Sequence, residues 1–184
     1  MDGNADRNTP AVEAFTDRAR RAIGRADRIA RDRGAAFIDT PHLLLALVEA
    51  GSGLGAEVLA GMGVNEALVA RVLDRIEREI GSAESGRVEH AIHMPLTRQA
   101  EEAITIAQRR AGALGHRAVG TEHLLLGLLD QGTGAAAGIL EALGVTAAAV
   151  RGELLRRVLE GLEGRLPRRR GAGEGTRGSR PDAH

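Results

Sequence analysis

The stretch "TPHLLLAL" at residues 40–47 returns as "TEHLLLGL" at residues 121–128, with an offset of 81 positions. Sliding the sequence against itself by this offset aligns residues 15–76 with residues 96–157 without a gap, and 24 of the 62 aligned positions are identical. This level of identity is far above chance. The sequence therefore contains two copies of one structural unit, and this repeat must decide the fold.

The identical positions near the start of each copy follow a helical period. Their offsets of 3, 4, 7 and 11 residues describe one stripe along an α-helix. The stripe is nearly all alanine, which lets a neighbouring helix approach closely, and the whole chain has only two Phe and no Trp or Tyr. The matched residues are Ala19, Ala22, Ile23, Ala26 and Ala30 in the first copy and Ala100, Ala103, Ile104, Ala107 and Ala111 in the second.

Each copy is predicted to form four helices. Thr16 and Thr97 begin the first helices, where a hydroxyl oxygen can accept a hydrogen bond from the first turn. Four short helices cannot bury all their apolar surface alone, so the copies should pack on each other. We therefore predict an all-α fold of two tandem four-helix repeats with approximate two-fold pseudosymmetry. The predicted limits are 16–33 and 97–114 for the first helices, ends near 62 and 143 for the third, and 65–80 and 146–160 for the fourth.

The second helices begin at the repeated motif. Thr40 and Thr121 are predicted to cap them. Pro41 suits the first helical position, where its missing N–H costs nothing, and Glu122 suits the positive end of a helix. Periodicity alone also allows a buried strand over "HLLLALV", but the Leu and Ala content favours a helix. Either residue at the second position of the motif, Pro41 or Glu122, is thus compatible with the local fold.

The predicted domain is a double repeat with polar flanks. The two ends of the chain contain few apolar residues and are expected to be disordered. The predicted organisation is a disordered N-terminus at 1–13, a double-repeat domain at 14–163 made of repeat one at 14–80, a linker at 81–95 and repeat two at 96–163, and a disordered Arg- and Gly-rich tail at 164–184.

Composition excludes several functions. All 25 basic residues are Arg and they balance 25 acidic residues, so no net charge attracts the chain to nucleic acid or membrane. A chain without Lys cannot carry a P-loop, and one without Cys has no thiol nucleophile and no sulfur ligand for a metal. The polar start "MDGNADRNTP" lacks the signature of a secretion signal, so we expect a cytoplasmic protein. Without aromatic residues, the Arg-rich tail is not expected to recognise nucleic acid specifically.

The histidines are the remaining candidates for chemistry. His42 and His123 each follow a helix start by two residues, and a buried imidazole bonded to the backbone is favoured for both over catalysis or metal binding. His90 and His93 could share a helical face, but two imidazoles make an incomplete metal site. We therefore predict no catalytic residue, no metal and no cofactor, and we expect that the protein is not an enzyme.

The repeat resembles the N-terminal domain of the Clp AAA+ unfoldases, most of all the ClpC type. The resemblance covers about residues 15–161 and is strongest in "FTDRARRAIGRADRIA", in "LGHRAVGTEHLLLGLLDQGTGAAAGIL" and in the repeated "MGV" or "LGV" exit. It implies a non-enzymatic domain that, in the family, sits on an ATPase ring and receives substrates and adaptor proteins. ClpC-type members bind proteins marked with phosphorylated arginine. No nucleotide-binding module follows in this sequence, so a stand-alone receptor domain is expected.

The resemblance also implies ligand-binding residues. In the family, the glutamate of G-T-E-H holds the guanidinium of phosphoarginine, and the threonine at the first helix start lies near the phosphate. Matching positions here are Glu122, Thr97 and Thr16, whereas Pro41 departs from the pattern and should cost one of two pockets its guanidinium partner. Both threonines are also plausible as helix caps alone.

The family further implies an apolar patch for partners and peptides. Phe15 and Leu96 match it, and Val12 is a further candidate, although Phe15 fits an ordinary core position equally well. The expected function is therefore capture of proteins, phosphoarginine-marked peptides or Clp-directed cyclic peptide antibiotics, as an adaptor or a decoy. The alternative is an accessory subunit that docks on the Clp unfoldase ring or peptidase. A small hydrolase or metal enzyme is the least favoured hypothesis.

Overall fold

The computed structural model describes residues 14–80 and 94–163, and these residues form eight helices and one pair of two-residue strands. Repeat one contributes α1 (Asp17–Asp32), α2 (Thr40–Ala50), α3 (Leu54–Gly61) and α4 (Glu66–Ile80). Repeat two contributes α5 (Arg98–Ala113), α6 (Thr121–Gln131), α7 (Ala135–Ala142) and α8 (Ala147–Glu163). The predicted all-α fold of two four-helix repeats is confirmed. The predicted disordered termini and most of the predicted linker lie outside the described residues.

The first helices start and pack as the sequence predicts. Thr16 and Thr97 are the N-caps of α1 and α5, and each Oγ1 accepts a hydrogen bond of 3.2 Å from the backbone N–H three residues later. The alanines of the stripe are buried in one continuous core with the leucines of α2 and α6. Small side chains on α1 and α5 therefore allow the two second helices to lie close above them.

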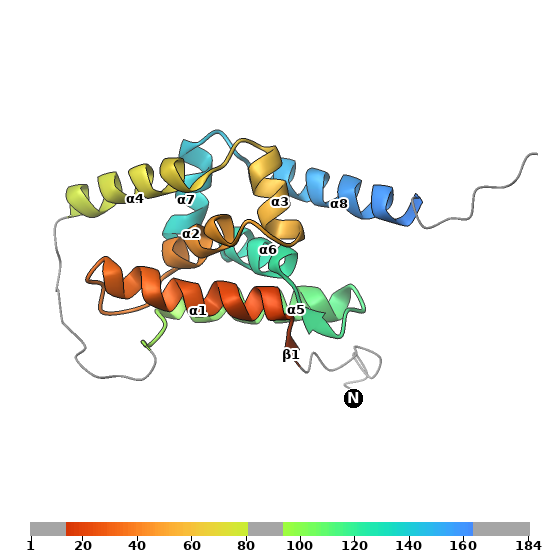
Figure 1. Ribbon diagram of the computed structural model, residues 1–184, viewed down its shortest axis with the longest axis horizontal. Helices are drawn as coiled ribbons and strands as arrows, with labels where there is room; N and C mark the ends of the chain where they lie inside the picture. The colour runs from red at the N-terminus through yellow and green to blue at the C-terminus, as the bar shows by residue number, and fades with distance from the viewer. Residues whose placement is uncertain (1–13, 81–93, 164–184) are drawn as a thin grey trace, which may run out of the picture.

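The third helices are exchanged between the repeats. In Figure 1, α7 stands beside α4, and α3 stands beside α8. α3 also packs on α6, and α7 packs on α2. Each third helix thus contacts the second and fourth helices of the other repeat. The two copies cannot separate without exposing the core that both of them build.

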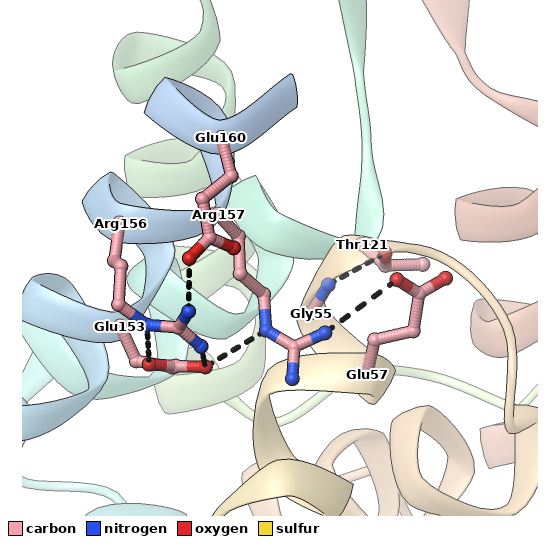
Figure 2. Close-up of polar contacts among 7 residues, drawn as sticks. All are labelled: Gly55, Glu57, Thr121, Glu153, Arg156, Arg157 and Glu160. Atoms are coloured by element: carbon pink, nitrogen blue, oxygen red, sulfur yellow. Dashed lines mark hydrogen bonds and ion pairs between the residues drawn. The ribbon is translucent and has the colours of Figure 1, made fainter. Parts of the chain in front are cut away.

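Two buried threonines join the exchanged helices. Oγ1 of Thr121 accepts a hydrogen bond of 3.1 Å from the backbone N–H of Gly55 in the first turn of α3, as Figure 2 shows. Oγ1 of Thr40 accepts the equivalent bond, 3.3 Å long, from Ala136 in the first turn of α7. A Cβ atom on Gly55 would lie 2.4 Å from the carbonyl oxygen of Thr121, so only glycine permits this approach.

The predicted capping role of Thr40 and Thr121 is therefore wrong. Both are the first helical residues, and the caps of α2 and α6 are Asp39 and Gly120. Their hydroxyl groups point to the other repeat and satisfy N–H groups of α3 and α7. The sequence shows a hydroxyl residue at a helix start, but it does not show which helix that hydroxyl caps.

A network of ion pairs lies on the outside of the α3–α8 contact. Arg157 on α8 lies 2.8 Å from Glu153 and 3.9 Å from Glu57 of α3, as Figure 2 shows. Hydrogen bonds from Arg156 and then Arg157 lower the pKa of Glu153 to about 2. Arg156 and Glu57 are exposed, while Glu153 and Arg157 are partly buried, so these charges orient α8 more than they stabilise the fold.

Two short parallel pairings connect the repeats at their beginnings. β1 (Ala14–Phe15) pairs with β2 (Ala118–Val119), and Phe15 lies opposite Val119. An isolated bridge joins Ile38 to Leu96, which are the repeat-equivalent positions of Val119 and Phe15. The sequence analysis did not predict these pairings because two-residue strands leave no periodic pattern.

His42 and His123 are buried and bonded to the backbone, as the favoured interpretation predicts. Nδ1 of His42 accepts from the N–H of Asp39 at 3.0 Å, and Nδ1 of His123 accepts from the N–H of Gly120 at 2.8 Å. Burial lowers the pKa of both imidazoles below the ordinary value. The two histidines therefore fix the turns that precede α2 and α6, and they do so in the neutral form.

No single helix among the described residues is long and apolar enough to cross a bilayer. Two helix pairs reach the length and apolar composition of a membrane span only when both helices of the pair are counted together across a sharp bend. These pairs are Thr40–Ala50 with Leu54–Gly61 and Ala135–Ala142 with Ala147–Glu160.

Replacing Thr121 by valine should remove the acceptor of the Gly55 N–H and leave that buried donor unsatisfied. We expect a loss of about 1–3 kcal/mol in the free energy of unfolding, measured by urea denaturation. Thr121→Ser keeps the hydroxyl and should lose less. Thr105→Val removes an exposed hydroxyl of α5 and should change stability by no more than about 0.5 kcal/mol. Equal stability of Thr121→Val and the wild type would contradict the role of this bond.

The buried histidines should make stability depend on pH. The unfolded chain takes up protons at His42 and His123 more readily than the folded chain, because burial lowers the folded-state pKa. The free energy of unfolding should therefore fall as the pH drops below about 6.5. Urea denaturation at pH 7.5, 6.5 and 5.5 measures this change, above the range in which most carboxylates titrate. A constant or rising stability over this interval would refute it.

Candidate ligand-binding junctions

The structure places the candidate residues in two separate junctions between the repeats. In the first, which we call the Thr16 junction, the N–H of Thr16 donates to the carbonyl of Val119 at 2.9 Å. In the second, the Thr97 junction, the N–H of Thr97 donates to the carbonyl of Ile38 at 2.9 Å. The Thr16 junction thus contains residues 119–122, and the Thr97 junction contains residues 38–41.

Each junction brings together the starts of two helices from different repeats. α1 and α6 start at the Thr16 junction, and α5 and α2 start at the Thr97 junction. In Figure 1, β1 marks the Thr16 junction at the N-terminal end of α1. Helix N-termini present unpaired N–H groups and a positive dipole end. The fold therefore creates one place that favours negative charge at each junction. There are two such places because the chain is a repeat.

Glu122 belongs to the Thr16 junction and not to the Thr97 junction. Its carboxylate folds back over Gly120, so that a Cβ at position 120 would lie 2.3 Å from its Oε1. The side chain is about one quarter exposed, and Oε1 lies 3.4 Å from Nδ1 of His123. A glycine at the N-cap thus leaves room for a long, partly accessible carboxylate over the residue that follows Val119, the partner of Thr16.

The first turns of α1 surround the Thr16 junction with positive charge. Arg18, Arg20 and Arg21 are exposed in this segment. The guanidinium of Arg20 donates to the carbonyl of Phe15 at 2.9 Å and lies 3.4 Å from Asp17. The junction therefore combines the carboxylates of Glu122 and Asp17, two helix starts and several guanidinium groups.

A pair of histidines supports the Thr16 junction from behind. Nδ1 of His116 lies 2.9 Å from Nε2 of His123, and the two rings meet edge to face. Because Nδ1 of His123 accepts the N–H of Gly120, the proton of the neutral ring must be on Nε2, which then donates to His116. Sequence analysis did not single out His116. The "GH" before the "GTEH" motif is the only signal that the sequence offers for it.

Donor atoms of His116, Glu122 and His123 lie within 4.8 Å of one another, which is a spacing that a metal ion accepts. Both ring nitrogens of His123 are already used in hydrogen bonds, to Gly120 and to His116. A metal on Nε2 would require that ring to lose its proton. The arrangement therefore fits a hydrogen-bond chain better than a metal site. His90 and His93 lie outside the described residues.

The Thr97 junction is built differently. Asp39 occupies the position that is glycine in the other repeat, and its Oδ1 accepts from the hydroxyl of Thr97 at 2.7 Å and from the N–H of Thr40 at 2.7 Å. Pro41 is buried at the position of Glu122. Ala35 stands at the position of His116, and Nε2 of His42 is left without a hydrogen-bond partner.

The predicted apolar patch is divided between the two junctions. Phe15 and Leu96 are half-buried against the core, Phe15 opposite Val119 and Leu96 opposite Ile38. Phe15 lies just before the start of α1. Leu96 lies near the other half of this helix, because Met94, two residues earlier, donates its N–H to Asp27 in the second half of α1. Ten helical steps, roughly 15 Å, separate the start of α1 from Asp27. The third candidate, Val12, lies outside the described residues.

Comparison with known proteins agrees with this fold. The chain is 41% identical over 148 residues to the chloroplastic chaperone protein ClpC of Pisum sativum and 40% identical over 163 residues to chloroplastic ClpC1 of Arabidopsis thaliana. These alignments cover 80% and 88% of the chain but only 15% and 17% of the relatives. The chain thus spans about one sixth of the length of these relatives.

Solved structures share the fold at lower identity. The N-terminal domain of ClpD from Arabidopsis thaliana superposes with a TM-score of 0.61 at 24% identity, over 80% of this chain and 96% of that one. The Hsp104 N-terminal domain from Candida albicans gives a TM-score of 0.64 at 19% identity, over 79% and 92%. The family described as the Clp repeat N-terminal domain matches residues 14–93 and again residues 95–182. With both repeats matched, the chain belongs to the Clp repeat N-terminal domain family.

Proposed function

We propose that the chain is a binding module that captures proteins or peptides carrying phosphorylated arginine, and that the Thr16 junction holds the modified side chain. The observation that carries this proposal is the placement of the Glu122 carboxylate over Gly120, which follows the Val119 carbonyl that accepts the N–H of Thr16. The proposal assigns no catalytic step to the chain.

Phosphoarginine has a cationic guanidinium part and an anionic phosphate, and the Thr16 junction offers a partner for each. The carboxylate of Glu122 can pair with the guanidinium nitrogens through two parallel hydrogen bonds. The phosphate would then lie toward the helix starts, where free N–H groups and the Thr16 hydroxyl can donate to it. Arg18 and Arg20 add positive charge on the phosphate side.

Protein partners would reach this junction easily because it lies at the surface. Phe15 is half-buried next to Thr16 and offers apolar contact to residues that flank the modified arginine or to a cyclic peptide. Binding at this place would hold a marked protein without changing it. The chain would act as an adaptor where it delivers the ligand to a Clp unfoldase, and as a decoy where it withholds the ligand.

Glu122→Ala should remove most of the affinity for phosphoarginine, because the guanidinium loses its charged partner. Loss of a hydrogen-bonded charge pair of about 1.5–3 kcal/mol corresponds to a decrease of roughly 10- to 150-fold in affinity. Isothermal titration calorimetry with free phosphoarginine measures the change, with arginine and phosphoserine as ligand controls.

Glu101→Ala is the matched control, since Glu101 is an exposed glutamate in the first turn of α5 at the other junction. It should bind phosphoarginine like the wild type. If the wild type gives no heat with phosphoarginine, or if both variants lose affinity equally, the proposed function is wrong.

A further inference from the structure

We propose that Asp39 acts as a built-in anion that closes the Thr97 junction, so that the domain takes a phosphorylated ligand at one end only. This inference rests on the proposed function, because it concerns the second of the two pseudo-equivalent junctions. The position of Pro41 explains only the loss of a guanidinium partner. Asp39 explains why the phosphate side of the junction is also unavailable.

The Asp39 carboxylate occupies the donors that an incoming anion would need. Its Oδ1 accepts from the hydroxyl of Thr97 at 2.7 Å and from the N–H of Thr40 at 2.7 Å. It also completes the capping box of α2 together with His42. The hydroxyl of Thr97 is fully used, because its oxygen accepts from the N–H of Ala100 while its proton goes to Asp39.

The Thr16 junction lacks this arrangement. Gly120 has no side chain to reach Thr16, and among the described residues no acceptor is recorded for the Thr16 hydroxyl proton. The carboxylate at the position corresponding to Pro41 comes from Glu122, on a longer side chain that makes no hydrogen bond to Thr16 within the part of the chain that the structure describes. The Glu122 carboxylate can therefore move aside or pair with a cation, whereas the Asp39 carboxylate is held between two helix starts.

The charges around the two junctions reinforce the difference. Arg20 and Arg21 on α1 are replaced in α5 by Glu101 and Glu102. All four lie in the first or second turn of their helices, next to the respective junction. Asp17 in α1 and its equivalent Arg98 in α5 run the other way, so the first two turns hold three Arg and one Asp at the Thr16 junction and one Arg and two Glu at the Thr97 junction. The Thr16 junction therefore favours a phosphate more than the Thr97 junction does.

A single functional junction limits how the domain holds a ligand with several marks. Two sites on one domain would bind a doubly phosphorylated peptide with increased avidity, because the second contact is intramolecular. One site binds each mark independently. We therefore expect singly and doubly marked peptides to bind the wild type with affinities that differ by no more than the statistical factor of about two.

The test uses four proteins, namely the wild type, Pro41→Glu, Asp39→Gly/Pro41→Glu and Asp39→Ser/Pro41→Glu. Glycine copies the residue at position 120, and serine keeps an N-cap without the charge, so at least one double variant should fold. Calorimetry with phosphoarginine gives the stoichiometry. Amide chemical shifts of Thr97 and Thr40, against those of Thr16 and Thr121, show by NMR which junction responds.

We expect one site in the wild type and in Pro41→Glu, and two sites in a folded double variant, with new shifts at Thr97 and Thr40. A second site in Pro41→Glu alone, or no response at Thr97 in either folded double variant, would overturn the role of Asp39. If the wild type shows no response at Thr16, the proposed function fails. In that case the amide chemical shifts of Thr97 in the wild type and the double variants still decide the role of Asp39, with phosphoarginine and inorganic phosphate as the probes.

Discussion

The structure depends on two buried hydroxyl groups that reach from one repeat to the other. Thr40 and Thr121 each start a second helix and cap the third helix of the opposite repeat. The Thr121 contact needs glycine at close range, because a Cβ at Gly55 would strike the carbonyl of Thr121, whereas the equivalent Thr40 contact is made to Ala136. Without these two bonds, the exchanged third helices would have unsatisfied N–H groups inside the core that both repeats build.

The exchange explains why the candidate junctions exist. Once α3 and α7 are fixed across the pseudo-two-fold relation, the first helix of each repeat starts beside the second helix of the other, and Val119 and Ile38 accept the N–H groups of Thr16 and Thr97. Two positive helix ends then meet at each junction. The ligand-binding geometry is therefore a consequence of how the repeats interlock, and neither repeat contains it alone.

The two junctions show how a duplicated scaffold acquires two different chemistries. The buried alanine stripes of the first helices are the same in both copies, as are most of the buried leucines, because both copies must fill the same core. The differences that matter for the junctions lie at and before the second helices, where Asp39, Pro41 and Ala35 stand at the positions of Gly120, Glu122 and His116. Together these changes alter the charge and the open donors of one junction.

The sequence by itself determined the repeat, the helical class, the N-caps Thr16 and Thr97 and the buried histidines, because these features follow from local periodicity and from short-range hydrogen bonds. It also indicated that Pro41 and Glu122 make the copies unequal. Only the tertiary structure decided that Thr16 shares a junction with Glu122, that Thr97 faces Asp39, and that Phe15 lies far from Leu96. These relations join residues 58 or more positions apart, and they depend on the exchange of helices between repeats, which leaves no local pattern in the chain.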